Sequence, residues 1–281
     1  IQAQTEKYMH VIVYGEYVQA PQVHYAKYLT SFLPDALQSI YFTNSGAEAT
    51  EGAMKLAKRV TGRTKIVAFK GAYHGSTQGA LSVMGDEYFK NAFRPLLPDI
   101  LHLRYNHFED IELIDDTVAC VLVELVQAET GVTPANKEWV IALRKKCDAL
   151  CILLIVDEIQ SGFGRTGTLF AFEQYGIEPD VLLVGKALGG GLPLGAFIAS
   201  TKMMSVLTEN PVLGHITTFG GNPVSCAIGT EVLRVIREEY LQENALETGN
   251  YLKAELRKMQ KEFPVIGEVR GQGLFLGIEL S

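Results

Sequence analysis

Residues 180–191 read D-V-L-L-V-G-K-A-L-G-G-G, and the interpretation of the whole chain starts from them. The aliphatic run at 181–184 predicts a strand that is buried on both faces, and Lys186 follows it after one glycine. A lysine at the carboxyl end of such a strand lies where open α/β sheets bind ligands. Burial there lowers the pKa of the amine and makes it a candidate nucleophile for a carbonyl group. Taken alone, the stretch is more typical of a surface lysine in a glycine-rich loop.

Two further apolar runs, 150–156 and 118–123, also end in ionisable residues, the first at Asp157 and the second at Glu124. Because the carboxyl ends of parallel strands meet at one edge of a sheet, we expect Glu124, Asp157 and Lys186 to lie together. A buried carboxylate stays ionised only beside a cation. A pyridinium nitrogen is such a cation, and a lysine Schiff base with an aspartate on the ring nitrogen is typical of sites for pyridoxal 5′-phosphate (PLP).

A turn into a helix follows the short strand that we predict at 39–42. Ser45 and Glu48 have the spacing of a capping box, and residues 47–60 are rich in helix formers up to Gly62. Backbone amides at such a helix start, together with the helix dipole, bind anions such as phosphate. The same pattern is also typical of a plain capped helix without a ligand.

Tyr73 and His74 follow the strand that we predict at 65–69. An aromatic side chain at the exit of a strand can stack on a planar ring. Equally, Tyr73 could belong to the core and His74 could be a structural histidine, so these residues alone leave both interpretations open.

The composition limits the classes of function. The chain has 281 residues and a formal net charge of −7, which disfavours nucleic acid and anionic membranes as partners. No apolar run approaches the roughly 20 residues of a membrane span. Cys120 and Cys151 fall within predicted buried strands, and no metal site is predicted because no ligand cluster accompanies the cysteines. We expect a cytoplasmic protein.

Predicted strands and helices alternate from about residue 39 to residue 199, which is typical of an α/β fold with a mostly parallel central sheet. We expect residues 1–240 to form a large domain and residues 241–281 to begin a small α+β C-terminal domain. That domain is expected to be incomplete, because the chain ends on an apolar strand at 271–280 with no strand to pair it. The chain also begins at Ile1 rather than at a methionine.

Several motifs follow one another along the chain: S-G-A-E-A at 45–49, Y-H-G at 73–75, D-E-I-Q-S-G-F-G-R-T-G at 157–167, G-K at 185–186 with the glycines after it, and T-F-G-G-N-P at 218–223. Together they resemble the class-III PLP-dependent aminotransferases, which include the acetylornithine, ornithine and 4-aminobutyrate enzymes. The resemblance covers nearly the whole chain. It implies the PLP-dependent transferase fold of type I, with helices on both faces of the central sheet, and PLP as the cofactor.

The resemblance also implies roles for the residues at matching positions. Lys186 would form the Schiff base with PLP and move the substrate proton, and Asp157 would bind the pyridinium nitrogen. The other cofactor-binding residues would be Ser45, Gly46 and Ala47 at the phosphate, Tyr73 on the ring, Gln160 near the ring hydroxyl, His74, Glu124 and Thr218. Thr218 would reach the phosphate of a neighbouring subunit, so a homodimer with shared active sites is implied. Glu129 resembles a substrate-binding glutamate that pairs with an arginine in several members.

The implied function is transfer of an amino group from an amino acid or ω-amine to a 2-oxo acid such as 2-oxoglutarate or pyruvate, by a ping-pong mechanism through aldimine and ketimine intermediates. The expected partners are therefore small-molecule amines and 2-oxo acids. A PLP-dependent aminomutase of the same fold and a truncated, non-catalytic fragment remain alternatives. A nucleotide-binding protein is disfavoured because the glycines at 189–191 do not fit G-x-G-x-x-G.

Three positions depart from the family pattern. Leu125 stands where proline is usual and Ala128 where glycine is usual, so the loop between them is expected to differ in shape. Ser76 replaces the arginine that acetylornithine-type members carry after His-Gly, which weakens an assignment to that substrate.

Overall fold

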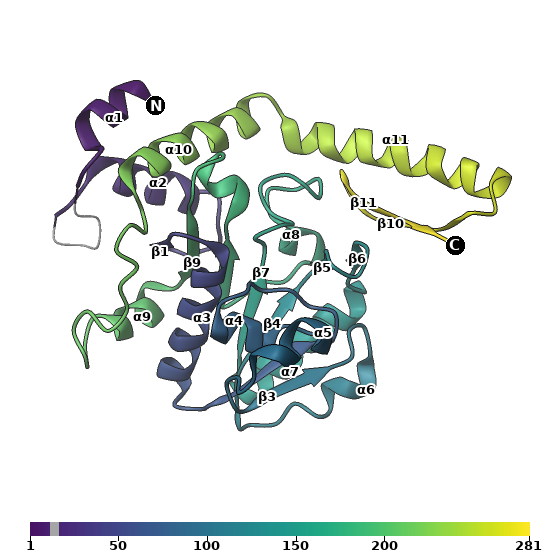
Figure 1. Ribbon diagram of the computed structural model, residues 1–281, viewed down its shortest axis with the longest axis horizontal. Coiled ribbons are helices and arrows are strands. Elements are labelled where there is room, and N and C mark those ends of the chain that lie inside the picture. Colours follow the sequence, from purple (N-terminus) through teal and green to yellow (C-terminus); the bar gives the residue numbers. More distant parts are fainter. Residues whose placement is uncertain (12–16) are drawn as a thin grey trace.

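The computed structural model describes residues 1–11 and 17–281, and its centre is a seven-stranded sheet with helices on both faces (Figure 1). The strands are β1 (Ser39–Thr43), β2 (Lys65–Phe69), β3 (Ile100–Leu103), β4 (Val118–Glu124), β7 (Leu153–Asp157), β8 (Val181–Val184) and β9 (Gly195–Ala199). Their order is β1-β9-β8-β7-β4-β2-β3. The pairs from β8 to β3 are parallel, whereas β9 is antiparallel to both of its neighbours. The predicted α/β fold with a mostly parallel sheet is confirmed.

Each face of the sheet carries its own apolar core, because successive residues of a strand point to opposite faces. On one face, Val121 and Leu182 lie in the cluster that includes residues of five helices. These are α2 (Ala20–Thr30), α6 (Phe108–Ile111), α7 (Lys137–Leu150), α8 (Phe172–Tyr175) and α10 (Pro223–Glu238). On the other face, Cys120 and Leu183 lie in the cluster of three helices. These are α3 (Gly46–Thr61), α4 (Gln78–Val83) and α9 (Thr201–Met204).

Shorter elements connect these parts. They are α1 (Gln2–Tyr8), α5 (Glu87–Lys90), α6 (Phe108–Ile111), the small antiparallel pair β5 (Val126–Gln127) and β6 (Thr133–Pro134), and the 3₁₀ turns η1 (Asn91–Phe93), η2 (Lys186–Gly189) and η3 (Ser205–Leu207). In the described parts of the chain, no helix has the length and apolar character that a membrane span requires.

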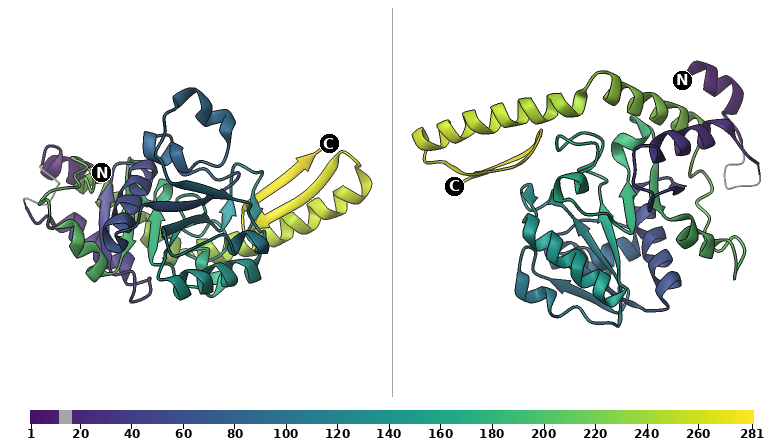
Figure 2. Two further views of the ribbon diagram at one scale, coloured as in Figure 1. Left: turned by 90° about the horizontal axis from the view of Figure 1, so that it is seen from below. Right: turned by 180° about the vertical axis from the view of Figure 1, so that it is seen from behind.

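The C-terminal residues form a long helix and a hairpin. Helix α11 (Leu241–Glu262) follows α10 and projects away from the central sheet, and strands β10 (Ile266–Gln272) and β11 (Phe275–Leu280) lie along it (Figures 1 and 2). The expectation that the last strand has no partner is wrong, because β11 pairs antiparallel with β10. The chain reverses at Gly273, whose φ of 54° suits a glycine, so the predicted strand at 271–280 contains a turn.

Cys151 also differs from its prediction. Helix α7 ends one residue before it, and Cys151 caps that helix in the left-handed conformation, with a φ of 52°. Strand β7 therefore starts at Leu153, and Cys151 is exposed, whereas Cys120 is buried within β4 as predicted. All four cysteines are free.

Helix α10 approaches the 3₁₀ turn that carries Lys186 very closely, and a glycine permits this. A Cβ atom at Gly229 would lie 2.3 Å from the carbonyl oxygen of Leu188 and 2.5 Å from the ring of Tyr25. The hydroxyl of Tyr25, on α2, donates a hydrogen bond of 2.8 Å to the same Leu188 oxygen. Helices α2 and α10 therefore hold the turn after Lys186 in place.

We expect Gly229→Ala to destabilise the chain by about 2 kcal/mol, because the added methyl group meets backbone and ring atoms that cannot both move away. In an unconstrained helix the same change would stabilise the protein by about 1 kcal/mol. The sign of the change in unfolding free energy therefore tells whether the close approach exists. Urea unfolding measures it, with Glu231→Ala at an exposed position of α10 as the control. A Gly229→Ala protein as stable as the wild type would contradict the close approach.

Candidate active site

Glu124, Asp157 and Lys186 meet at the carboxyl edge of the sheet, as predicted. Strands β4 and β7 are parallel neighbours in which Glu124 pairs directly with Asp157. Strand β8 lies beside β7, and Lys186 follows it after Gly185. All three residues line one cavity of about 510 Å³. The other predicted site residues that line it are Ser45, Gly46, Ala47, Tyr73, His74, Glu129 and Gln160.

Some lining residues were not predicted. Thr77 and Ile159 contribute to the wall, as do Gly75, Ser76 and Ala128. Each is adjacent in sequence to a predicted residue or to another of these, so the motifs contained a signal for them, but only the path of the backbone shows which neighbours face inward.

Asp157 is a buried carboxylate with two hydrogen-bond partners. Its Oδ2 is 2.7 Å from Nδ1 of His74, and its Oδ1 accepts a hydrogen bond of 2.9 Å from the backbone N–H of Ile159. Burial by itself lowers the pKa of His74, but the hydrogen bond and the charges of Asp157 and Glu124 outweigh it and raise that pKa above 6.5. When it is protonated, the imidazole supplies the cation that a buried carboxylate requires.

His74 presents a further polar atom to the interior. Its Nε2 is buried and has no hydrogen-bond partner among residues 1–11 and 17–281. Buried polar atoms are nearly always hydrogen-bonded in folded proteins. This orphaned atom beside the cavity therefore marks a place where an additional polar group fits.

Glu124 and Glu158 are both buried but serve different parts of the fold. Glu124 accepts a hydrogen bond of 3.1 Å from the backbone N–H of Tyr73 and lines the cavity. Burial raises the pKa of Glu124, an effect that His74 opposes and Asp157 reinforces.

The carboxylate of Glu158 turns away from the cavity. It accepts hydrogen bonds from Ser161 and from the backbone N–H groups of Ala171 and Phe172, at 2.8 to 2.9 Å. Burial raises the pKa of Glu158 to about 7. Of the two adjacent acids after β7, Asp157 therefore belongs to the site and Glu158 holds the loop that follows it.

The start of α3 forms a further part of the cavity wall. The hydroxyl of Ser45 accepts a hydrogen bond of 3.2 Å from the backbone N–H of Glu48, as a capping box predicts. The carboxylate of Glu48 reaches one residue further back than expected, to the backbone N–H of Asn44 at 2.7 Å. Gly46 and Ala47 precede Ala49, whose N–H makes the first backbone hydrogen bond of the helix, so their own N–H groups and the helix dipole can bind an anion.

The segment with His74 is packed directly on this helix start. The hydroxyl of Thr50 donates a hydrogen bond of 2.9 Å to the carbonyl oxygen of His74. Gly75 follows with a φ of 124°, and a Cβ atom there would lie 2.6 Å from that of Ala47. Only glycine allows both the conformation and the approach.

Lys186 lies on the cavity wall in a strained conformation, with a φ of 45°. Such strain in a residue other than glycine is typical of functional sites. Burial and the nearby Arg165 lower the pKa of its amine, while Asp157, Glu124 and Glu129 oppose that shift. The lower pKa increases the fraction of neutral, nucleophilic amine.

Four predicted site residues remain to be placed. Tyr73 is 40% exposed, so it belongs to the cavity wall and not to the core. Gln160 also lines the cavity, and its carbonyl oxygen accepts a hydrogen bond of 3.0 Å from Nε of Arg165. Glu129 lies on the cavity wall with its side chain exposed. Thr218 is exposed on a separate loop and does not line the cavity that the described residues of its own chain enclose.

The geometry thus defines a cavity that is lined by the start of α3, two buried carboxylates and a lysine. This is the donor set of a site for a phosphorylated, cationic ring. A group of three or more side chains able to hold a metal ion does not occur in the described residues.

Comparison with known proteins identifies the family. Residues 1–281 match the family model described as aminotransferase class-III, so the chain belongs to that family. It is 41% identical to a [LysW]-aminoadipate semialdehyde/glutamate semialdehyde transaminase of Sulfurisphaera tokodaii over 90% of the chain and 65% of that protein. It is 40% identical to an acetylornithine aminotransferase of Methanopyrus kandleri over 100% of the chain and 70% of that protein.

Solved structures agree with the family assignment. An ornithine aminotransferase from Toxoplasma gondii, described with partial occupancy of PLP at its active site, superposes with a TM-score of 0.93 and 30% identity. That comparison covers 100% of the chain and 67% of the other protein. The chain therefore spans about two thirds of the length of these relatives, and it has the fold of type-I PLP-dependent transferases.

The cofactor of this family is PLP, and the residues present fit it. The amides of Gly46 and Ala47 suit its phosphate, and the Asp157 carboxylate suits its protonated ring nitrogen. The buried Nε2 of His74 has no hydrogen-bond partner within the described residues. A polar group bound beside Asp157 could therefore form a hydrogen bond with it. Lys186 lies on the wall of the same cavity.

We expect Asp157→Asn to lower the pKa of His74 below 6.5, because the main effect that raises it is lost while burial remains. Glu124→Gln should lower it less. NMR titration of the His74 imidazole measures both shifts. In the wild type the raised pKa stabilises the fold fully below pH 6.5, and this contribution is lost as the pH rises through the folded-state pKa. An unchanged His74 pKa in Asp157→Asn would show that the pair is not coupled.

Proposed function

We propose that the chain carries the cofactor site and the catalytic lysine of an aminotransferase, which moves an amino group from an amino acid or ω-amine to a 2-oxo acid. The observation that carries the proposal is the position of Lys186 in one cavity with the ion-paired Asp157 and the start of α3. The names of two relatives, an acetylornithine aminotransferase and a semialdehyde transaminase, support amino-group transfer.

The phosphate end of the cofactor binds at the start of α3. The backbone N–H groups of Gly46 and Ala47 donate to it, and Ser45 fixes the helix start by accepting from Glu48. Because the helix has 16 residues, its dipole adds a favourable field at this end.

Asp157 and Tyr73 would hold the ring of the cofactor. The Asp157 carboxylate would keep the ring nitrogen protonated, and His74 orients that carboxylate through a buried hydrogen bond of 2.7 Å. Tyr73 would bind the ring face, and Gln160 would bind the ring hydroxyl. Glu124 holds the backbone of Tyr73 in place.

Lys186 carries the proton transfers. When bound, PLP supplies an electron sink for the negative charge that develops on the carbon next to the transferred amino group. The Nζ atom of Lys186, whose pKa is lowered, can accept the proton from that carbon and donate it again as a general acid. Glu129 contacts the substrate at the exposed side of the cavity.

We further propose a homodimer in which Thr218 completes the phosphate site of the partner subunit. Thr218 lies outside the cavity of its own chain, on a loop that exposes Val212, Leu213, Ile216 and Phe219. A dimer interface would cover these apolar side chains. We also propose that residues 241–281 begin a second domain and that the protein works in the cytoplasm, where its four cysteines would stay reduced.

The first test is the visible absorbance spectrum of the full-length protein with PLP, before and after addition of amine donors. We expect the band of lysine-bound cofactor, and we expect one class of donor to bleach it. A band that no donor bleaches would contradict the aminotransferase assignment, and the absence of any band would contradict the cofactor site.

Lys186→Ala should abolish transamination and the band of lysine-bound cofactor, because no other amine lines the cavity in the described part of the chain. The fold should persist, since Lys186 already occupies a strained conformation that alanine tolerates no worse. Steady-state kinetics and thermal unfolding measure the two effects, with the exposed Lys202→Ala as the control. An active Lys186→Ala protein would refute the assignment.

Sedimentation equilibrium should show a dimer in the full-length protein. Phe219→Asp should weaken it, because the change places a charge among the exposed apolar side chains of the Thr218 loop. Weaker PLP binding should accompany dissociation. A strictly monomeric protein with full activity would exclude a role for Thr218 across an interface.

A further inference from the structure

The cavity residue Glu129 lies on a tight turn, residues 127–133, which we call the Glu129 turn. Strands β5 and β6 pair across its base, from Val126 to Pro134 and from Gln127 to Thr133. The carbonyl oxygen of Ala128 accepts hydrogen bonds of 3.2 Å from both Gly131 and Val132. The turn connects two strands of two residues each, so its own contacts hold it weakly.

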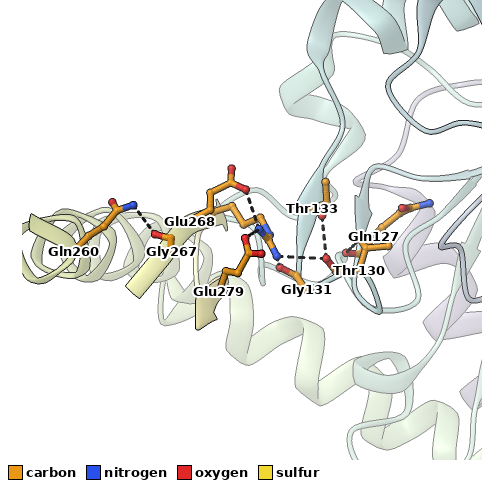
Figure 3. A network of polar contacts seen from close by, with 9 residues as sticks. Gln127, Thr130, Gly131, Thr133, Gln260, Gly267, Glu268 and Glu279 are labelled. Carbon is orange, nitrogen blue, oxygen red and sulfur yellow. Dashed lines mark hydrogen bonds and ion pairs between the residues drawn. The ribbon is translucent and has the colours of Figure 1, made fainter. Parts of the chain in front are cut away.

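The hairpin of β10 and β11, which we call the C-terminal hairpin, supports this turn from outside the cavity. Arg270 of β10 donates a hydrogen bond of 2.8 Å from Nε to the carbonyl oxygen of Gly131, and its Nη2 lies 3.5 Å from that of Thr130. Figure 3 shows this network, in which Glu268 and Glu279 of the hairpin face Thr130 and Gly131 of the turn. The guanidinium group therefore bonds the carbonyl oxygens of the two residues that directly follow Glu129.

Carboxylates of the hairpin orient the same guanidinium. Its Nη1 is 2.8 Å from Glu268 and 3.2 Å from Glu279, so all three nitrogens of the group are engaged. The Arg270 side chain is 18% exposed, whereas those of Glu268 and Glu279 are 64% and 59% exposed. Such exposed ion pairs contribute little stability, so their effect is to direct the planar donor group at the turn.

The backbones on both sides are shaped for this contact. Gly131 has a φ of 77°, and a Cβ atom there would lie 2.6 Å from Nη2 of Arg270. Gly277 pairs with Arg270 in the hairpin, and a Cβ atom on Gly277 would lie 2.2 Å from the carbonyl oxygen of Gly131. Glycine on both surfaces permits a separation that any side chain would prevent.

We propose that Arg270 is a positioning residue, which holds the Glu129 turn and thereby sets where the Glu129 carboxylate meets the substrate. The inference rests on the proposed function of the cavity and extends it to a residue of the C-terminal hairpin. Arg270 acts on the backbone after Glu129, not on the Glu129 carboxylate. Its loss leaves the turn with the bonds of β5 and β6 and the hydrogen bonds within the turn, and the carboxylate then samples more positions.

The first experiment measures the turn without any activity assay. Amide hydrogen exchange in the full-length protein with PLP should be faster across residues 127–133 in Arg270→Ala than in the wild type. Exchange in α7, at 137–150, should be unchanged. Arg270→Lys retains one donor and should give an intermediate rate. Unchanged exchange at 127–133 would overturn the proposal.

The second experiment measures the consequence for substrate. Misplacing a binding group from outside the site can cost up to about 100-fold, so we expect the KM for the amine donor to rise on the order of tenfold in Arg270→Ala. The kcat and the affinity for PLP should change less, because Asp157 on β7 and Lys186 on η2 lie outside the Glu129 turn. The double variant Glu268→Gln/Glu279→Gln keeps the Arg270 donors and leaves amide oxygens that can still accept from Nη1, so its KM should rise less than that of Arg270→Ala.

Non-additivity decides whether Arg270 acts through Glu129. In a Glu129→Gln background, Arg270→Ala should produce little further rise in KM. A full tenfold rise in that background would overturn the proposal, since Arg270 would then act by another route. If the wild type transaminates no donor, the proposed function fails on its own account, and hydrogen exchange still decides whether Arg270 holds the turn.

Discussion

The buried carboxylate of Asp157 is the constraint on which the site depends. A charge at this depth is tolerated only with partners, and His74 and the backbone N–H of Ile159 provide them at 2.7 and 2.9 Å. His74 in turn is held by Thr50 on α3, which connects the segment beside the carboxylate to the helix whose start lines the cavity.

Close backbone approaches give the cavity its remaining walls. Gly75 lies against Ala47 at the start of α3, and Gly229 lies against Leu188 in the turn after Lys186. In both places a side chain would separate an element of the site from its support. The strained φ of 45° at Lys186 is stable because α2 and α10 fix the turn that follows it.

The C-terminal hairpin shows how a segment outside the central sheet can influence the site. Arg270 is not the only contact of the hairpin. The backbone N–H of Leu274 donates a hydrogen bond of 3.1 Å to the carbonyl oxygen of Arg165. The side chain of Arg165 in turn donates a hydrogen bond to the carbonyl oxygen of Gln160. The hairpin therefore contacts both the Glu129 turn and the loop after Asp157.

The sequence by itself determined the buried strands, the ionisable residues at their carboxyl ends and the capped helix, because apolar runs and capping residues act over a few neighbouring positions. It therefore predicted Glu124, Asp157, Lys186 and the anion site, and its motifs identified the family. Only the tertiary structure decided that Asp157 faces the cavity while Glu158 turns away, that β11 pairs with β10, and that Arg270 supports the Glu129 turn. These features join residues up to 140 positions apart, and no local pattern encodes a contact whose partners meet only when the sheet has formed.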